Sequence, residues 1–275
     1  WEPPASLDDL DELAVRIGSA QMMAPWCLAL ESGTATGWPA TDWTEDLVLR
    51  LEGKDVYDGW ASGDVAFADD AIAAAFDAFS SLVLGTGRLA GDTRRAVETS
   101  TRDVFGPLFA DEPGCAMVKQ ADFAREWMPS GTTVGPDADV DFFVLPAVTE
   151  TAEIPPLVVG ADLAVQFRSD PVVDEFMAFL AGADAGAPWA RQGGYLSPKS
   201  TFDPAVYPDD GERRLAELLA TAPVLAFDAS DQMPPSIGSG LLWEGITAWV
   251  AGGRKYADLA AELDDAFEEL EGAAG

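Results

Sequence analysis

Apolar residues recur every three or four positions along several stretches of this chain, and short apolar runs lie between those stretches. A spacing of three to four residues predicts amphipathic helices, whereas a short apolar run predicts a buried strand. The first helix should begin after Ser6, a residue suited to capping its N-terminus, with acidic residues in the first turn. The other expected helices span 38–52, 67–84, 93–109, 122–127, 171–180, 210–221, 239–250 and 256–270.

Strands are expected at five shorter runs. Because these strands alternate with longer helices, the chain is predicted to be of the α/β class. The alternation alone does not distinguish a binding lobe from a Rossmann domain. A linker is expected at 149–156, where Pro and Glu are frequent. The expected strands are 27–30, 115–118, 141–145, 157–165 and 224–227.

Charge and composition exclude several classes of partner and site. The 275 residues carry a net charge of −32, which argues against nucleic acid and anionic lipid as partners. The chain has no His, so the commonest general base and the commonest metal ligand are missing. The acidic residues at 137, 139 and 141 lack the Gly and the distant Glu of a calcium loop. We therefore expect a solvated acidic surface, no metal and no cofactor.

One window, residues 25–46, combines aromatic and acidic side chains. Trp26, Trp38 and Trp43 flank a loop rich in Gly and Thr, and Asp42 and Glu45 lie beside them. Core packing is the ordinary role of a Trp. Acidic and Gly residues are unusual neighbours for a core, however, and aromatic walls with a few polar groups are typical of small-molecule sites. Flat indole faces also suit the apolar face of a pyranose ring.

Six segments of the chain resemble a known family, the extracellular solute-binding proteins of family 1. Within it they resemble the carbohydrate-binding subunits of ABC importers, in the branch that carries α-glucosides. The resemblance runs from residue 1 to 253 in the family's order, and residues 1–10 resemble a mid-chain segment of that family. The segments are PWCLALESGTATGWPATDWTED at 25–46, GCAMVKQADF at 114–123, PLVVGADLAV at 156–165, QGGYLSPK at 192–199, FDASDQMP at 227–234 and GSGLLWEG at 238–245.

The resemblance implies an α/β fold of the periplasmic-binding-protein-like type II, with one nearly complete lobe plus part of the other. Residues 1–155 would form the main part of the second lobe, 156–195 the crossover segment of the first lobe, and 196–275 the closing helices. The chain would then be the C-terminal two-thirds of the protein. Roughly one hundred further residues, with an export signal and a lipid-anchor Cys, are expected upstream.

The resemblance also implies a binding protein rather than an enzyme. The two lobes would close on an α-glucoside or similar oligosaccharide and deliver it to ABC permease subunits, with no bond broken. The protein would be a monomer outside the cytoplasm, held to the membrane only through a lipid anchor that this chain lacks. Two free thiols would be expected in a cytosolic protein, but the resemblance favours export and hence a Cys27–Cys115 disulfide.

Ligand-binding residues follow from the same resemblance. The window at 25–46 would form one wall of the sugar site, and a Trp at the start of a late helix stacks on the sugar in the wider family. Asp228 and Asp231 either accept hydrogen bonds from sugar hydroxyls or cap a turn. The candidate residues are Trp38, Asp42, Trp43, Gln120, Phe123, Asp162, Gly194, Tyr195, Asp228, Asp231 and Trp243.

The alternative interpretation is an acidic secreted glycoside hydrolase. Such an enzyme would use the same Trp platforms with a pair of carboxylates. Glu31 with Asp42, or Asp228 with Asp231, could form that pair, although neither stands out by its spacing or surroundings.

Overall fold

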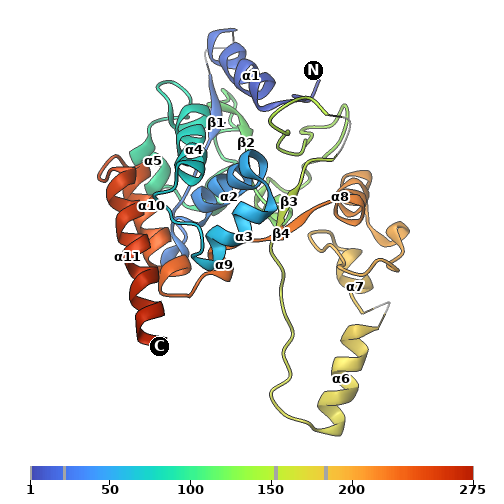
Figure 1. Ribbon diagram of the computed structural model, residues 1–275. Helices are drawn as coiled ribbons and strands as arrows, with labels where there is room; N and C mark the ends of the chain where they lie inside the picture. The colour runs from blue at the N-terminus through green and yellow to red at the C-terminus, as the bar shows by residue number, and fades with distance from the viewer. Residues whose placement is uncertain (1, 21–22, 152–153, 183–184, 275) are drawn as a thin grey trace. The chain divides into compact units, whose positions relative to one another are not determined.

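The chain folds into two compact units. The structure, a computed structural model, describes residues 2–20, 23–151, 154–182 and 185–274 (Figure 1). Unit 1 contains Trp1–Gln120, Val144–Val159 and Pro223–Gly275, and unit 2 contains Ala121–Phe143 and Gly160–Ala222.

Unit 1 is mainly helical around two small sheets. Helix α2 begins at Trp38 with Pro39 in its first turn, where the fixed φ of Pro suits a helix start, and it packs on α3 and α4. Its elements are α1 (Leu7–Ala20), β1 (Ala24–Cys27), α2 (Trp38–Glu52), α3 (Lys54–Ser62), α4 (Asp70–Phe79), α5 (Thr93–Glu98), β2 (Cys115–Val118), β3 (Leu157–Val159), β4 (Leu225–Phe227), α9 (Ala229–Gln232), α10 (Trp243–Val250) and α11 (Tyr256–Ala274).

Each sheet consists of two parallel strands. In the first, β1 pairs with β2 so that Trp26 lies opposite Met117. In the second, β3 pairs with β4 so that Val158 lies opposite Ala226. Parallel neighbours need a long crossover, and here the crossovers carry most of the helices. This is an α/β arrangement, as the alternation of short strands and helices predicts.

An aromatic core holds α2 against α4. The Trp43 ring stacks on Phe79 with centroids 5.7 Å apart, and Trp26 meets Trp43 edge-on at 5.0 Å. The Trp26 indole N–H donates to the Leu82 carbonyl at 2.9 Å, so its one polar atom is satisfied inside the core.

Unit 2 is smaller and more open. Its described helices are α6 (Pro171–Ala181), α7 (Ala187–Ala190) and α8 (Asp210–Thr221), and residues 122–127 form a 3₁₀ helix. Helix α6 buries none of its described residues. Several large apolar side chains of this unit are exposed, namely Leu163, Val165, Phe167, Val172, Phe176 and Phe179.

The units have different bounds from the segments 1–155, 156–195 and 196–275 predicted above. Residues 121–143 belong with 160–222 because two arginines join them. Arg125 pairs with Asp209 and Glu212, and Arg214 pairs with Asp141. Residues 152 and 153 of the predicted linker 149–156 lie outside the described residues.

Helix predictions hold best where the ends have local signals. The expected helices at 38–52 and 210–221 match α2 and α8, and α6 ends one residue later than expected. The expected helix at 93–109 is wrong beyond Glu98. After Glu98 the backbone forms hydrogen bonds with Glu31 instead of continuing the helix. The Glu31 N–H donates to the Thr99 carbonyl at 3.0 Å, and the Thr101 N–H donates to the Glu31 carbonyl.

Strand predictions are uneven. The expected strand 115–118 matches β2, and β4 begins one residue later than the expected 224–227. The first strand begins and ends three residues earlier than the expected 27–30, and β3 covers only the start of 157–165. The expected strand 141–145 is absent from the described structure. Its backbone acceptors bind arginine side chains instead of a neighbouring strand. Arg214 donates to the Phe142 carbonyl at 3.1 Å, and Arg50 donates to the Leu145 carbonyl at 2.9 Å.

Cys27 and Cys115 form a disulfide, the pairing that the family resemblance implies. The two Cα atoms are 5.5 Å apart across β1 and β2, and the bond joins positions 88 residues apart in the sequence. Both half-cystines are buried. A bond that closes so long a loop removes much of the conformational freedom of the unfolded chain.

We expect the double substitution Cys27→Ser with Cys115→Ser to lower the free energy of unfolding by about 2–4 kcal/mol, the usual effect of losing such a bond. Urea unfolding followed by circular dichroism measures it. A reducing agent should shift the wild-type midpoint in the same direction and leave the double variant unchanged. Equal midpoints for the wild type and the double variant would contradict the expectation.

Candidate functional site

The first turns of α2 and α10 are in close contact in unit 1. Gly37 precedes α2 with φ +114°, a conformation that favours glycine. A methyl group at this position would lie 2.4 Å from the Trp243 carbonyl oxygen and 2.7 Å from Thr247 Oγ1. The absence of a side chain therefore lets α2 approach α10, and it brings together the turns that carry Trp38 and Trp243, both partly exposed.

The two tryptophans of α2 have different environments. Trp38 is partly exposed at the start of the helix. Trp43 is 1% exposed and is enclosed by Phe79, Trp26 and Lys119, whose Nζ lies 5.4 Å from the ring centroid. The prediction of a ligand contact for Trp43 is therefore corrected: its indole is core, and it presents no face to solvent.

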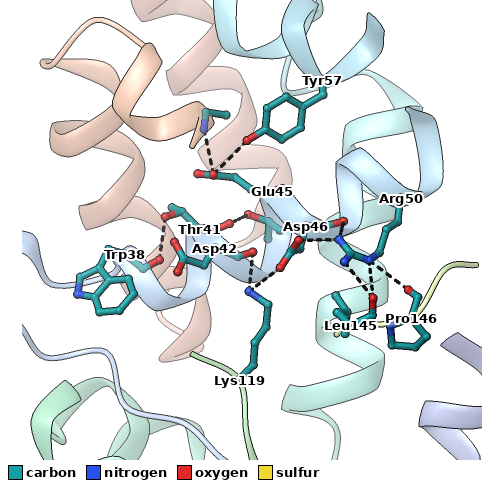
Figure 2. Close-up of polar contacts among 12 residues, drawn as sticks. Trp38, Thr41, Asp42, Glu45, Asp46, Arg50, Tyr57, Lys119, Leu145 and Pro146 are labelled. Carbon is teal, nitrogen blue, oxygen red and sulfur yellow. Dashed lines mark hydrogen bonds and ion pairs between the residues drawn. The ribbon is translucent and has the colours of Figure 1, made fainter. Parts of the chain in front are cut away.

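Three carboxylates of α2, those of Asp42, Glu45 and Asp46, lie within about one turn of each other, as Figure 2 shows. Asp46 binds Arg50 at 2.5 Å and Lys119 at 2.8 Å. Burial raises the pKa of Asp46, but the charges and hydrogen bonds of Arg50 and Lys119 outweigh it and hold the pKa below its usual value. Arg50 also donates to the Leu145 and Pro146 carbonyls, so this ion pair anchors an irregular segment.

Glu45 is completely buried. Its carboxylate accepts hydrogen bonds from the Ala229 N–H at 2.9 Å, the Ser230 N–H at 3.1 Å and the Tyr57 hydroxyl at 3.3 Å. Burial, then the charges of Asp228 and Asp42, raise the pKa of Glu45 well above its usual value. The Tyr57 hydroxyl also lies 2.8 Å from the Phe227 carbonyl. Together these bonds tie α2 and α3 to the end of β4. Sequence reasoning did not assign this role, and an acidic residue on the apolar face of a helix is its only local sign.

Asp42 precedes both of these groups by about one turn of α2 and is partly buried. Burial, followed by the charges of Asp228, Asp46 and Asp231, raises its pKa to about 7, although Lys119 acts in the opposite direction. Lys119 also donates to the main-chain carbonyl of Asp42 at 3.0 Å (Figure 2). Near neutral pH this carboxyl group therefore exists in both its protonated and its ionised form. The ionised form accepts a hydrogen bond from a hydroxyl group, and the protonated form can donate one to it.

Asp228 caps α9. One of its oxygens accepts from the Asp231 N–H at 2.9 Å and from the Ser230 hydroxyl at 2.7 Å. Of the two roles predicted for this aspartate, the cap is the one that the structure contains. The Trp243 indole N–H donates to the same Ser230 hydroxyl at 3.3 Å, and Asp231 is exposed in the first turn. A chain of polar contacts therefore connects Asp228 to Trp243.

Gln120 follows β2 at the end of a segment of unit 1. Its side-chain oxygen Oε1 is buried and has no hydrogen-bond partner among the described residues. A buried acceptor without a partner is costly, so this oxygen is a position where a donor would stabilise the protein.

The remaining candidates lie in unit 2. The Gly194 N–H donates to Glu212 at 3.1 Å, and the Tyr195 ring stacks on Trp189 with centroids 4.9 Å apart. Phe123 is 43% exposed and packs edge-on against Trp127. Asp162 is exposed on the irregular segment after β3, and within the described part of the chain no hydrogen bond or ion pair joins it to another candidate.

The structure thus places the candidates in separate groups. Trp38, Asp42, Asp228, Asp231 and Trp243 gather around α2, α9 and α10 of unit 1. Gly194 and Tyr195 share a loop with Trp189 in unit 2, and the sequence did not single out Trp189.

The described residues contain no cluster of three or more acidic or sulfur side chains arranged to hold a metal ion. Within the same residues, no helix is both long enough and apolar enough to cross a membrane.

No protein-family model matches this chain. It is 35% identical over 252 residues to the osmoprotective compounds-binding protein GgtB of Synechocystis, covering 92% of this chain and 59% of that protein. It is 34% identical over 271 residues to the alpha-glucosides-binding periplasmic protein AglE of Rhizobium meliloti, covering 98% of this chain and 58% of that protein.

The chain is a homologue of solute-binding proteins. This relationship confirms the resemblance found in the sequence, and both relatives are named as binding proteins, not as enzymes. The chain spans about three-fifths of the length of these relatives, 59% and 58% respectively.

Solved structures agree on the fold. A chitin oligosaccharide binding protein superposes with a TM-score of 0.70 at 15% identity, over 98% of this chain and 65% of that one. The bacterial solute receptor AcbH, described as preferring β-D-galactopyranose, superposes with a TM-score of 0.67 at 17% identity, over 100% of this chain and 65% of that one. At such identities the likeness concerns the fold, which is that of an α/β binding protein.

We expect Gly37→Ala to lower the free energy of unfolding by about 2–4 kcal/mol, because the added methyl group forces α2 away from α10 and strains a left-handed backbone. Gly33→Ala is the matched control. Gly33 also has a positive φ, +61°, but no atom lies within 4 Å of the added methyl group, so a loss of only about 1 kcal/mol is expected. Urea unfolding of both variants measures these changes. Equal losses of unfolding free energy in the two variants would contradict the close approach of α2 to α10.

The stability of the folded chain should depend on the protonation of Asp42. Its pKa of about 7 in the folded state exceeds the value of about 3.9 in an unfolded chain, so the folded state holds the proton more tightly. The free energy of unfolding therefore falls as pH rises from about 4 to about 7. Asp42→Asn removes this loss. We expect the variant to exceed the wild type by about 1–3 kcal/mol near pH 8 and to equal it near pH 4.

Urea unfolding at the two pH values measures this difference. Asp55→Asn, at an exposed position of α3, is the control and should change stability equally little at both. A difference between Asp42→Asn and wild type that is the same at both pH values would contradict the raised pKa.

Proposed function

We propose that this chain belongs to the sugar-binding subunit of an ABC importer, which binds an α-glucoside or a similar oligosaccharide and delivers it to a membrane permease. The observation that carries the proposal is the 34% identity to an alpha-glucosides-binding periplasmic protein over 98% of the chain. Because the chain spans about three-fifths of that relative's length, 58%, the activity of the whole protein is part of the proposal.

The side chains around α2, α9 and α10 support a sugar ligand. Trp38 and Trp243 are partly exposed indoles on adjoining helix starts, and an indole face suits the apolar face of a pyranose. Asp42 and Asp231 supply carboxyl groups beside them, which accept hydrogen bonds from hydroxyls. Gln120 adds a buried acceptor without a partner in the described structure. We propose Gly194 and Tyr195 as contacts from unit 2, with Phe123 and Asp162 as further candidates.

The disulfide supports a place outside the cytoplasm, and the charge limits the partners. Disulfides persist in oxidising compartments, and the Cys27–Cys115 bond is buried in unit 1. The net charge of −32 disfavours nucleic acid and anionic membranes as partners. We propose that the protein acts as a monomer, with permease subunits as its protein partners and a lipid anchor outside this chain.

A second candidate ligand is an osmoprotective compound, since the relative with 35% identity is named for such ligands. The glycoside hydrolase alternative has no support among the relatives. One of its two candidate carboxylate pairs, Asp228 with Asp231, is also less favoured, because Asp228 caps α9.

Isothermal titration of the whole subunit that contains this chain with maltose, trehalose, diacetylchitobiose, galactose and glycine betaine tests the proposal. We expect saturable binding of an α-glucoside, with the sugar recovered intact. Trp243→Ala should weaken that binding about tenfold or more, equivalent to a loss of ~1.4 kcal/mol. Phe176→Ala removes an exposed aromatic ring from α6 and should leave affinity unchanged. Hydrolysed sugar would refute a binding role, and binding of glycine betaine alone would favour the second candidate.

A further inference from the structure

Glu212, in the first turn of α8, is a carboxylate with almost no contact with solvent. The residue is 1% exposed. One oxygen, Oε1, accepts from Arg125 at 3.0 Å and from the Gly194 N–H at 3.1 Å. The other, Oε2, is buried and has no hydrogen-bond partner among the described residues. A charged group is costly to bury in such surroundings unless its hydrogen bonds compensate. We therefore ask which part of the chain these hydrogen bonds fix in position.

Arg125 binds the carboxylate of Glu212, and Asp209 binds its backbone. The guanidinium of Arg125 donates to Glu212 through one terminal nitrogen and to Asp209 through the other. Asp209 also caps α8 by accepting the Glu212 N–H at 3.0 Å. With its backbone and its carboxylate both bound, Glu212 is a rigid acceptor.

The group that this acceptor holds is the loop at 193–197. Gly193 and Gly194 both have positive φ, +84° and +74°, so the chain makes a tight turn that most residues would strain. The Gly194 N–H is bound to Glu212, and the Ser197 N–H donates to the hydroxyl of buried Tyr207 at 2.9 Å. The loop is therefore fixed on both sides of Tyr195.

Tyr195 in turn supports an exposed aromatic ring. It stacks on Trp189 with an interplanar angle of 25°, and Trp189 is 52% exposed. Gly186 makes room for the phenol, because a methyl group there would lie 2.4 Å from the Tyr195 hydroxyl oxygen. A large flat ring held half in solvent by a stacked partner suits a ligand with a flat apolar face.

We propose that Glu212 is a positioning residue, which fixes the Gly193–Gly194 turn so that Trp189, backed by Tyr195, offers a stacking platform for a pyranose ring. This inference rests on the proposed sugar-binding function and adds two residues, Trp189 and Glu212, to it. Glu212 touches no ligand in this scheme and acts through the loop, whereas Trp189 makes the contact.

Hydrogen exchange by NMR, without ligand, tests the positioning role. In Glu212→Ala, the Gly194 amide should exchange at least tenfold faster than in wild type. Glu212→Gln should restore slow exchange, because its amide oxygen can still accept the Gly194 N–H. Asp210→Ala, an exposed acidic position on the same helix turn, is the control and should match wild type. If Glu212→Ala fails to fold, Glu212→Asp takes its place, since it keeps the charge but is one methylene too short to reach the loop.

Titration with the α-glucoside that wild type binds tests the platform. Glu212→Ala and Trp189→Ala should each weaken binding about tenfold, and only Glu212→Ala should speed exchange at Gly194. Unchanged exchange in Glu212→Ala overturns the positioning role. Faster exchange with wild-type affinity in both variants overturns the platform. If wild type binds none of the sugars, the proposed function fails and the platform with it, while the exchange data still decide whether Glu212 holds the loop.

Discussion

The burial of Glu45 is the interaction on which unit 1 most depends. A carboxylate in the middle of α2 reaches the backbone N–H groups of Ala229 and Ser230 and the hydroxyl of Tyr57. These partners come from two segments, α3 and the start of α9, so one side chain sets the distances among α2, α3 and the β4–α9 corner. Removing it would leave buried donors unpaired, a cost comparable with a large share of the stability of a typical domain. Asp228, the cap of α9, and Asp231 in its first turn lie in this corner.

Elements with local signals could be predicted from the sequence. Pro39 and Pro171 mark helix starts, Asp209 caps α8, and the structure has these helices at the expected positions. The strands could not be predicted as reliably, because a strand depends on a partner elsewhere in the chain. The run at 141–145 reads as apolar and extended, yet its carbonyls meet Arg50 and Arg214 instead of a second strand.

In the candidate site, too, the sequence predicts local features but not those that depend on distant parts of the chain. Aromatic and acidic residues in the window at 25–46 indicated a ligand wall, but the sequence could not separate Trp38, at the surface, from Trp43, in the core. Their spacing of five residues places them on different sides of α2, and only the packing of α4 determines which side is covered. Likewise, Trp38 approaches Trp243 because Gly37 packs against the Trp243 carbonyl, about two hundred residues further along the chain. No local sequence pattern predicts that contact.

The disulfide has a mechanical consequence. It joins Cys27 to Cys115, so α2, α3, α4 and α5 all lie inside one covalent loop. A pulling force applied between the two ends of the chain would pass through the sulfur atoms and bypass residues 28–114 entirely. The backbone of α2, α3, α4 and α5 would bear no tension until the bond itself was reduced, whereas the segments outside the loop would extend first.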